Sequence, residues 1–494
     1  MTAIRHEIRF LLNGRKVTLT DVPPERTLLD FLRIERRLIG TKEGCAEGDC
    51  GACTVLVGRL SGDTLVYEGV NACIRFLGSL DGCHVVTVEH LKRPDGSLHP
   101  VQQALVDFHG SQCGFCTPGF VMSLYALWMR VPNPSEAAIE KALQGNLCRC
   151  TGYAPIVRAA CAISSYGGVD TDPLAAEREA VTAELKALRD GARVEIGQGR
   201  ERLVIPASVD DLAHVLEAEP EATVVAGSTD VGLWVTKFMR DIAPVVFIGG
   251  LEALHTISEK DGTLSIGAGV SYSEAFPLLA THIPAFGRLI DRIGGDQVRN
   301  MGTIGGNIAN GSPIGDTPPP LIALGATLTL RKGDRRRTIP LEDFFIGYGQ
   351  QDRQPCEFVE AVHVPLPDPN THFAVWKISK RRDEDITAAL GAFAMKRASD
   401  GTVASARLAY GGMAPTPKRA AAAEAALVGN EWTRETVERA VIALEQDFTP
   451  ISDMRASAEY RMMAAKNLLR RFFLETSGDP GPLEVARDHK EIAA

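Results

Sequence analysis

The stretch Cys45-Ala-Glu-Gly-Asp-Cys50-Gly-Ala-Cys53 decides the fold of the first part of this 494-residue chain. A fourth thiol, Cys73, follows after nineteen intervening residues, and ten of the eleven cysteines lie in the first third of the sequence. Cytosolic thiols are kept reduced, so thiols crowded in this way form metal sites more often than disulfides. The sequence therefore predicts a metal site here.

The spacing of these four cysteines is C-x4-C-x2-C…C, which is typical of plant-type [2Fe–2S] clusters. Gly44, Gly48 and Gly51 allow the loop to turn tightly, with backbone N–H groups free for the cluster sulfurs. A zinc site more usually shows two C-x2-C pairs. The pattern favours an iron–sulfur cluster over zinc or structural thiols.

A second set of thiols occupies Cys113-Gly-Phe-Cys116 and Cys148-Arg-Cys150. C-x2-C alone fits zinc, a redox dithiol or an iron–sulfur cluster. The C-x-C pair suits a two-iron cluster better than a closed tetrahedral zinc, and both pairs fall near predicted helix ends with unpaired N–H groups. We expect the remaining cysteines to be small buried hydrophobic side chains: Cys83, Cys161 and Cys356.

The hydrophobic pattern divides the chain into several domains, as its length requires. Residues 1–90 read as a small α+β domain, with a hairpin at Asn13-Gly14, an amphipathic helix over 27–38 and strands at 52–58, 64–70 and 84–91. Residues 91–165 carry four helical segments and predict a helical bundle.

The rest of the chain divides less sharply. Residues 166–190 hold little that could build a core and predict a linker that is helical in part. Short apolar strands and Gly-rich turns follow over 191–370, and strands with Ala-rich helices follow over 371–480. We expect the polar tail, 481–494, to fray.

Two Gly-rich stretches, Val224–Gly232 and Arg299–Asp316, could offer successive backbone N–H groups to a pyrophosphate. Neither matches a GxGxxG or Walker A loop, and on residues alone both could be ordinary turns. The charged run Lys380–Ile386 is, on composition, a solvated strand edge.

The strings QCGFCTPGFVMSLYAL and GNLCRCTGYAPIV resemble the second iron–sulfur domain of the molybdenum hydroxylases, and GCAEGDCGACTV resembles their first. The family includes xanthine dehydrogenases, aldehyde oxidases and carbon monoxide dehydrogenases. The resemblance implies a multidomain α+β fold class: a ferredoxin-like [2Fe–2S] β-grasp domain, a helical-bundle [2Fe–2S] domain, a vanillyl-alcohol-oxidase-like FAD domain (191–370) and a C-terminal α+β flavoprotein domain (371–480). It implies these cluster ligands: Cys45, Cys50, Cys53, Cys73, Cys113, Cys116, Cys148 and Cys150.

The resemblance also implies contacts with FAD, with Ile293 where vertebrate xanthine dehydrogenases place a Phe against the flavin ring. The implied residues are Val224, Val225, Ala226, Gly227, Ser228, Thr229, Asp230, Val231, Ile293, Thr303, Gly305, Gly306, Asn307, Asp316, Val359 and Lys377. Gln112 would face the pterin of a partner chain. Tyr348, Glu384 and Gly412 would lie at the flavin face where NAD docks, together with the run Tyr410–Met413.

The implied role is electron transfer in a xanthine dehydrogenase, an NAD-dependent oxidoreductase of purine catabolism. A molybdopterin-binding large subunit would hydroxylate hypoxanthine and xanthine to urate, and this chain would carry electrons through two [2Fe–2S] clusters to FAD and NAD, with no catalytic residue of its own for the hydroxylation. The family expectation is an (αβ)2 assembly. Two alternatives stay open: the same subunit serving an aldehyde or N-heterocycle hydroxylase, or a molybdenum-free NADH-oxidising flavoprotein.

The net charge and the distribution of apolar residues limit which partners and which cellular location are expected. The net charge of -9 argues against a nucleic-acid partner, since phosphate contacts need a basic surface. No apolar run is long enough to span a bilayer, and the start MTAIRHEIRFLLNG lacks the features of a secretory signal. We therefore expect a cytoplasmic protein.

Overall fold

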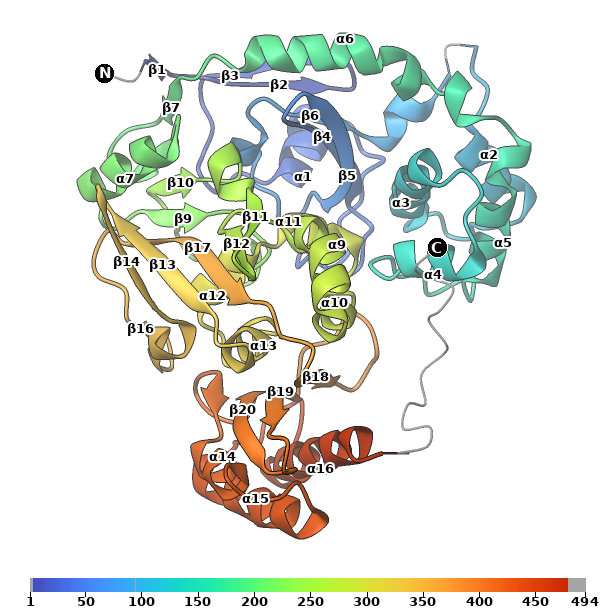
Figure 1. Cartoon of the computed structure of the whole chain (residues 1–494). Helices are drawn as coiled ribbons and strands as arrows, with labels where there is room; N and C mark the ends of the chain where they lie inside the picture. The colour runs from blue at the N-terminus through green and yellow to red at the C-terminus, as the bar shows by residue number, and fades with distance from the viewer. Residues whose placement is uncertain (1–2, 94, 479–494) are drawn as a thin grey trace. The chain divides into compact units, whose positions relative to one another are not determined.

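The computed structural model describes residues 3–93 and 95–478 (Figure 1). They divide into two compact units. The first runs up to Glu252 and takes in a later segment, Gly294–Gly302. The second comprises Ala253–Ile293 and the chain from Thr303 onward.

The first unit opens with a mixed five-stranded sheet in the order β3-β2-β6-β4-β5. Asn13 and Gly14 both adopt positive φ, 49° and 74°, so the predicted hairpin has the turn that Asn-Gly favours. The strands are β2 (Ile8–Leu12), β3 (Arg15–Leu19), β4 (Thr54–Ser61), β5 (Thr64–Asn71) and β6 (His84–Val86).

Two local predictions for this domain need correction. The amphipathic helix is only α1 (Leu28–Asp30), and it continues as a π-helical turn, Phe31–Glu35. The predicted strand over 84–91 ends at Val86, because the Asn13 side chain accepts the N–H of Thr87 at 2.9 Å and the chain then forms a 3-10 turn.

The helical bundle is confirmed as a set of four helices around a core that includes Phe120, Leu124 and Trp128. Proline lies in the first turn of three of them, where its missing N–H costs nothing. The helices are α2 (Pro100–Asp107), α3 (Thr117–Arg130), α4 (Glu136–Ala142) and α5 (Ala154–Ala162).

The predicted linker contains α6 (Pro173–Leu188), and it does build a core. Val181, Leu185 and Leu188 lie on one face of the helix and pack on leucines of the first sheet, forming a satellite cluster. A stripe of three apolar residues at helical spacing is sufficient for this cluster. The predicted helix is confirmed, and the prediction that this stretch holds little that could build a core was wrong. Asp172 caps the helix and accepts hydrogen bonds from Leu174 N–H and the Tyr125 hydroxyl.

A second sheet in this unit, in the order β1-β7-β8-β10-β9, shares its hydrophobic core with the first. Phe247 on β10 lies so close to Gly78 that a Cβ there would stand 2.4 Å from its ring. The elements are β1 (Ile4–Arg5), β7 (Arg193–Ile196), β8 (Leu203–Ile205), β9 (Thr223–Val225), β10 (Val245–Phe247), α7 (Val209–Ala218), α8 (Val231–Thr236) and α11 (Asp296–Met301).

The second unit contains an antiparallel sheet, β11-β12-β17-β13-β14, and a separate antiparallel sheet, β18-β19-β20-β21. The strands of the first are β11 (Ile257–Lys260), β12 (Thr263–Gly267), β13 (Thr327–Lys332), β14 (Arg335–Pro340) and β17 (Phe358–Pro365). Those of the second are β18 (Thr371–Ile378), β19 (Ala389–Arg397), β20 (Val403–Gly411) and β21 (Lys418–Arg419).

Helices cover both sheets of this unit, and a small hairpin, β15 (Phe345–Gly347) with β16 (Gln350–Gln351), stands apart from them. The helices are α9 (Tyr272–His282), α10 (Pro284–Ile290), α12 (Ile304–Asn310), α13 (Pro318–Ala323), α14 (Ala421–Leu427), α15 (Arg434–Asp447) and α16 (Ala458–Thr476).

Two further sequence-based expectations concern the C-terminal tail and membrane-spanning segments. The tail 481–494 lies outside the described residues. Among the helices of residues 3–93 and 95–478, none is long and apolar enough to cross a membrane.

Replacing Gly119 with Ala tests how the two N-terminal domains join. A Cβ on Gly119 would lie 2.1 Å from the carbonyl oxygen of Gly51, a backbone atom that cannot move freely. Overpacking of this kind costs about 2 kcal/mol, so we expect the unfolding midpoint of the Gly119→Ala protein to fall by several degrees in scanning fluorimetry. The control is Gly69→Ala, whose Cβ would meet only Thr54 Cγ2 at 3.7 Å. Equal unfolding midpoints for the two variants would contradict close packing of Gly119 against the Gly51 carbonyl.

Candidate functional site

The thiols of the first cysteine set converge. Cys53 and Cys73 are buried, and Cys45 and Cys50 are half-buried. Cys45 lies within hydrogen-bond distance of the Cys50 and Cys73 thiols, and Cys73 also contacts Cys53. The thiols of Cys50 and Cys73 hold the pKa of Cys45 far below its usual value, and the same contact raises that of Cys50.

The backbone of the loop explains this convergence. Ala46, Gly48 and Gly51 all have positive φ, at 55°, 80° and 67°, so the chain winds around the sulfurs. The N–H groups of Glu47 and Cys50 each point at Cys45 Sγ, at 3.4 Å. The predicted role of the loop glycines is confirmed for Gly48 and Gly51, and this donor set suits a cluster held by four thiolates.

The second cysteine set forms two pairs nearer the surface. Cys150 Sγ lies 3.6 Å from Cys113 Sγ, and both residues are exposed. Burial, and then contact with Cys148, raises the pKa of Cys116 to about 12. Cys116 directly precedes the first residue of α3, so it lies at a helix end as the sequence predicted. Among the described residues, no group of three or more His, Cys, Asp or Glu side chains is arranged to hold a single metal ion.

Hydrogen bonds connect the two cysteine loops directly. Leu147 N–H, next to Cys148, donates to the carbonyl of Cys50 at 3.0 Å, and the Asn146 side chain donates to that of Gly51 at 3.3 Å. Gln297 on α11 is 1% exposed and reaches both domains. Its Nε2 lies 3.0–3.1 Å from Thr54 Oγ1, Ser123 Oγ and Asn146 Oδ1. Sequence reasoning missed Gln297, because nothing local marks a glutamine so distant in the chain.

The first predicted flavin stretch follows β9 as a loop and enters α8. Gly227 passes so close to the backbone of Met301 that a Cβ would lie 1.5 Å from its carbonyl oxygen, and Ser228 has a φ of 60°. The described residues provide no backbone acceptor for the N–H groups of Gly227, Ser228 and Thr229. This loop therefore fits a phosphate-bearing cofactor.

The second predicted flavin stretch is not the open nest expected. Residues 304–310 are helix α12, and the Thr303 side chain caps Gly306 N–H at 2.9 Å. Ile304 N–H and Gly305 N–H bond to carbonyls of the β12 turn, so these donors are used within the protein. Gly305 is needed for this close approach, because a Cβ would lie 2.5 Å from Ala268 Cα. The Asn307 side chain accepts from the Thr317 hydroxyl at 2.5 Å.

A buried ion pair occupies the next predicted position. Lys377 Nζ donates to Asp316 Oδ2 at 2.6 Å, and the Thr387 hydroxyl donates to Asp316 Oδ1 at 2.5 Å. The two charged side chains are only 3% and 11% exposed. Both carboxylate oxygens of Asp316 are thus engaged by the protein, and the structure brings Asp316 and Lys377 together although the sequence separates them by 61 positions.

The predicted NAD-face residues lie on three separate elements. Tyr348 is 76% exposed at the turn between β15 and β16, and Glu384 has a φ of 49° within the charged run. Gly412 has a φ of 75°, and its carbonyl accepts from the buried Arg461, which also bonds to Ala388 O.

The burial of the remaining predicted residues varies. Tyr410 and Met413 are fully buried in the C-terminal core, and their place at the flavin face where NAD docks stays a prediction. Cys83 is buried as expected, whereas Cys161 is exposed on α5 and Cys356 is half-buried, which corrects that expectation. Ile293 and Val359 pack on the core that α9 and β17 share, and Gln112 is exposed beside Cys113.

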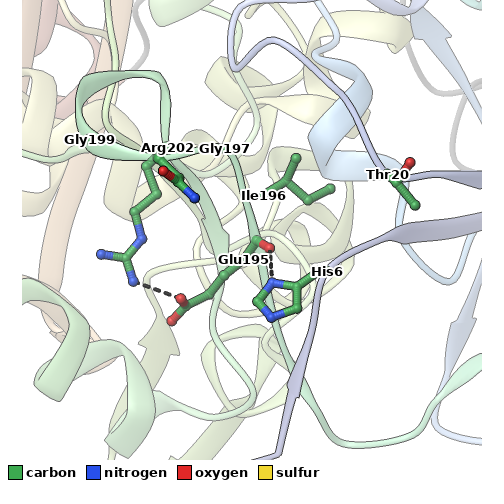
Figure 2. A pocket seen from close by; sticks show the side chains of 8 residues that line it. His6, Thr20, Glu195, Ile196, Gly197, Gly199 and Arg202 are labelled. Carbon is green, nitrogen blue, oxygen red and sulfur yellow. Dashed lines mark hydrogen bonds and ion pairs between the residues drawn. The ribbon is translucent and has the colours of Figure 1, made fainter.

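The first unit contains a cavity of about 540 Å³ (Figure 2). Its charged lining groups are already paired. Arg202 bonds to Glu195 and Glu219, and His6 Nδ1 lies 2.9 Å from the carbonyl of Glu195. None of the predicted site residues lines it: its wall is formed by His6, Thr20, Glu195, Ile196, Gly197, Gln198, Gly199 and Arg202.

The Asp316→Asn substitution tests the buried ion pair. It would leave the Lys377 ammonium without its counter-charge in a buried site, at a cost of about 3 kcal/mol. We expect the unfolding midpoint to drop by several degrees in scanning calorimetry. The matched change is Asp368→Asn at the exposed pair with Lys396, which should leave the midpoint unchanged, since exposed pairs contribute little. If the unfolding midpoint of Asp316→Asn were unchanged, the stabilising role of the buried Asp316–Lys377 ion pair would be contradicted.

Four family models match the chain in sequence order. They describe a 2Fe-2S iron–sulfur cluster binding domain (residues 10–77), a [2Fe-2S] binding domain (87–161), an FAD binding domain in molybdopterin dehydrogenase (198–367) and a CO dehydrogenase flavoprotein C-terminal domain (374–476). The predicted multidomain fold class and the cofactor set of two [2Fe–2S] clusters and FAD are confirmed.

Three known proteins illustrate what this chain is similar to. Xanthine dehydrogenase of Emericella nidulans is 34% identical over 94% of this chain, but the chain spans only 38% of that protein. The structure of carbon monoxide dehydrogenase from Hydrogenophaga pseudoflava, which lacks the Mo-pyranopterin moiety of its cofactor, matches with 31% identity and a TM-score of 0.52 over 54% of this chain and 93% of that one. Quinoline 2-oxidoreductase from Pseudomonas putida 86 gives 26% identity and a TM-score of 0.51 over 56% of this chain and 96% of that one. The chain therefore belongs to the molybdenum hydroxylase family, as its iron–sulfur and flavin electron-transfer module.

Proposed function

We propose that this chain is the electron-transfer subunit of a xanthine dehydrogenase. It would receive electrons from a molybdenum centre on a large partner subunit that converts hypoxanthine and xanthine to urate, and deliver them to NAD. The observation that carries the proposal is the joint between the cysteine loops, where Leu147 N–H bonds to Cys50 C=O beside two converging thiol sets. The similarity to xanthine dehydrogenases over 94% of this chain supports the substrate.

The proposed cluster ligands are the four cysteines of each set. The first set is Cys45, Cys50, Cys53 and Cys73, and the second is Cys113, Cys116, Cys148 and Cys150. Iron–sulfur clusters carry single electrons, and a flavin can accept these and release a hydride. The chain itself has to hold these groups at fixed separations and keep water from the first set, whose Cys53 and Cys73 are buried.

FAD would be held by residues 224–231, where the N–H groups of Gly227, Ser228 and Thr229 have no backbone acceptor among the described residues. Thr303, Gly305, Gly306 and Asn307 would also contact it. Because the N–H groups of Ile304 and Gly305 are engaged within the protein, the contribution of α12 would come from side chains and close packing. Asp316, Lys377, Ile293 and Val359 remain predicted flavin contacts. Tyr348, Glu384 and Gly412 remain predicted for NAD, and the cytoplasmic location also remains a sequence-based prediction.

The surface around the second cysteine set supports docking of the molybdopterin-binding subunit there. Cys113, Cys150 and the proposed pterin neighbour Gln112 are exposed. Three apolar side chains beside them are also exposed, by 39–47%: Phe115, Leu147 and Tyr153. Apolar groups around a redox centre at the surface suit a lasting interface, in keeping with an (αβ)2 assembly.

A second candidate is the same subunit in an N-heterocycle hydroxylase. The similarity to quinoline 2-oxidoreductase, which covers 96% of that chain, favours it. In either proposal the partner subunit would bind the organic substrate, so only that subunit separates them.

The test of the function combines cofactor analysis with reconstitution. The purified chain should contain about four iron and one FAD, and should reduce NAD with xanthine only in complex with a molybdenum-bearing partner. Cys73→Ser and Cys150→Ser should each lower the iron to about two, whereas Cys161→Ser should retain four. Zinc in place of iron would refute the clusters; a complex that ignores xanthine but oxidises quinoline would move the assignment to the second candidate.

Phe115→Asp tests the docking surface. A carboxylate placed among Phe115, Leu147 and Tyr153 would be desolvated by a partner, so we expect the yield of the complex in a pull-down to fall at least tenfold with cofactor content unchanged. Ile442→Asp is the control, because Ile442 is a 64% exposed apolar residue on α15. Equal yields for both variants would contradict docking at the second cysteine set.

A further inference from the structure

The segment that leaves the proposed flavin loop contacts the loop of the first cysteine set. The Thr236 hydroxyl, at the end of α8, donates to the carbonyl of Ala46 at 2.7 Å. The next residue, Lys237, donates from Nζ to the carbonyl of Cys45 and lies 3.5 Å from Glu47 Oε2. One short helix therefore joins the two proposed cofactor loops.

The fit between α8 and the cluster domain is close along its whole length. A Cβ on Gly232 would stand 2.8 Å from Ile74 Cβ, directly after Cys73. Leu233, Trp234 and Val235 pack against the core that the first sheet provides. The helix is thus placed by packing, and its last residues are held against the cysteine loop rather than swinging free.

The loop of the first cysteine set is rich in negative charge, and Lys237 provides a positive charge in contact with it. The stretch from Glu43 to Cys50 carries three carboxylates, Glu43, Glu47 and Asp49, and four thiolates with a two-iron cluster would add further negative charge. Lys237 places a cation on the carbonyl of a proposed ligand, Cys45. Its side chain is 37% exposed, so solvent screens the charge only in part.

We infer that Lys237 and Thr236 are positioning residues for the first cluster. Lys237 raises its reduction potential, and the two side chains together hold the Cys45–Glu47 backbone in the shape that points N–H groups at Cys45 Sγ. The inference rests on the proposed function, since it requires a cluster on this loop and a flavin on residues 224–231.

Two physical effects support these roles. Reduction adds negative charge to an anionic cluster, and a nearby cation favours the reduced form. Ala46 has a φ of 55°, a conformation that non-glycine residues adopt rarely, so its carbonyl needs a fixed partner to keep the turn. The Thr236 hydroxyl is that partner.

The test is a redox titration of the holo-chain followed by electron paramagnetic resonance. In Lys237→Gln, one of the two cluster potentials should shift to more negative values, by about a tenfold change in the ratio of reduced to oxidised cluster, which is about 59 mV for one electron. Lys237→Arg should keep the potential near the wild-type value. Lys186→Gln is the charge control, because Lys186 pairs with Asp63 at the β4–β5 turn, the far end of strands about 25 Å long.

The iron content and the two cluster potentials distinguish failure of this inference from failure of the proposed function. Iron content near four with both potentials unchanged in Lys237→Gln would overturn the inference and leave the proposed function standing. Loss of about two iron in Lys237→Gln or Thr236→Val, with retention in Lys237→Arg and Lys186→Gln, would support the positioning role. A wild-type chain without iron would refute the proposed function itself.

Discussion

The carbonyl of Gly51 is the point on which the N-terminal half of the structure depends. It accepts hydrogen bonds from Thr54 and from the side chain of Asn146, and the first turn of α3 packs directly on it at Gly119. Gly51 itself has a φ of 67°, and any side chain there would strike the backbone of Gly145. One residue thus shapes the first cysteine loop and fixes the helical domain against it. Electron transfer between two clusters needs a short, constant separation, and a backbone-to-backbone joint provides it more rigidly than side chains would.

The two cysteine sets differ in burial, and this difference suits electron transfer from the second set to the first. Cys53 and Cys73 of the first set are buried, whereas Cys113 and Cys150 of the second set are exposed. This difference supports the proposed function, in which the second set would receive electrons from the partner subunit and the first set would pass them toward the flavin. Lys237 adds a positive charge beside the first set, since its Nζ donates to the carbonyl of Cys45.

Within each unit, buried polar side chains join segments that are far apart in the sequence, and no local sequence pattern predicts these contacts. Gln297 spans three polar side chains from two iron–sulfur domains, and Arg461 joins Ala388, Gly412 and Asp453 within the second unit. Such groups are satisfied only when all partners are in place, which makes them sensitive to the final packing.

The sequence by itself determined the elements and motifs whose causes are local. Asn13-Gly14 encodes its turn through positive φ, the helices over 100–162 follow from apolar spacing and proline, and the C-x4-C-x2-C spacing places three thiols in one loop. Only the tertiary structure decided the rest. It made α6 a core helix, turned the predicted nest at Thr303 into a capped helix, exposed Cys161, and set Asp316 against Lys377 and Lys237 against Cys45. These outcomes depend on contacts between residues far apart in the chain, whose energies no local pattern contains.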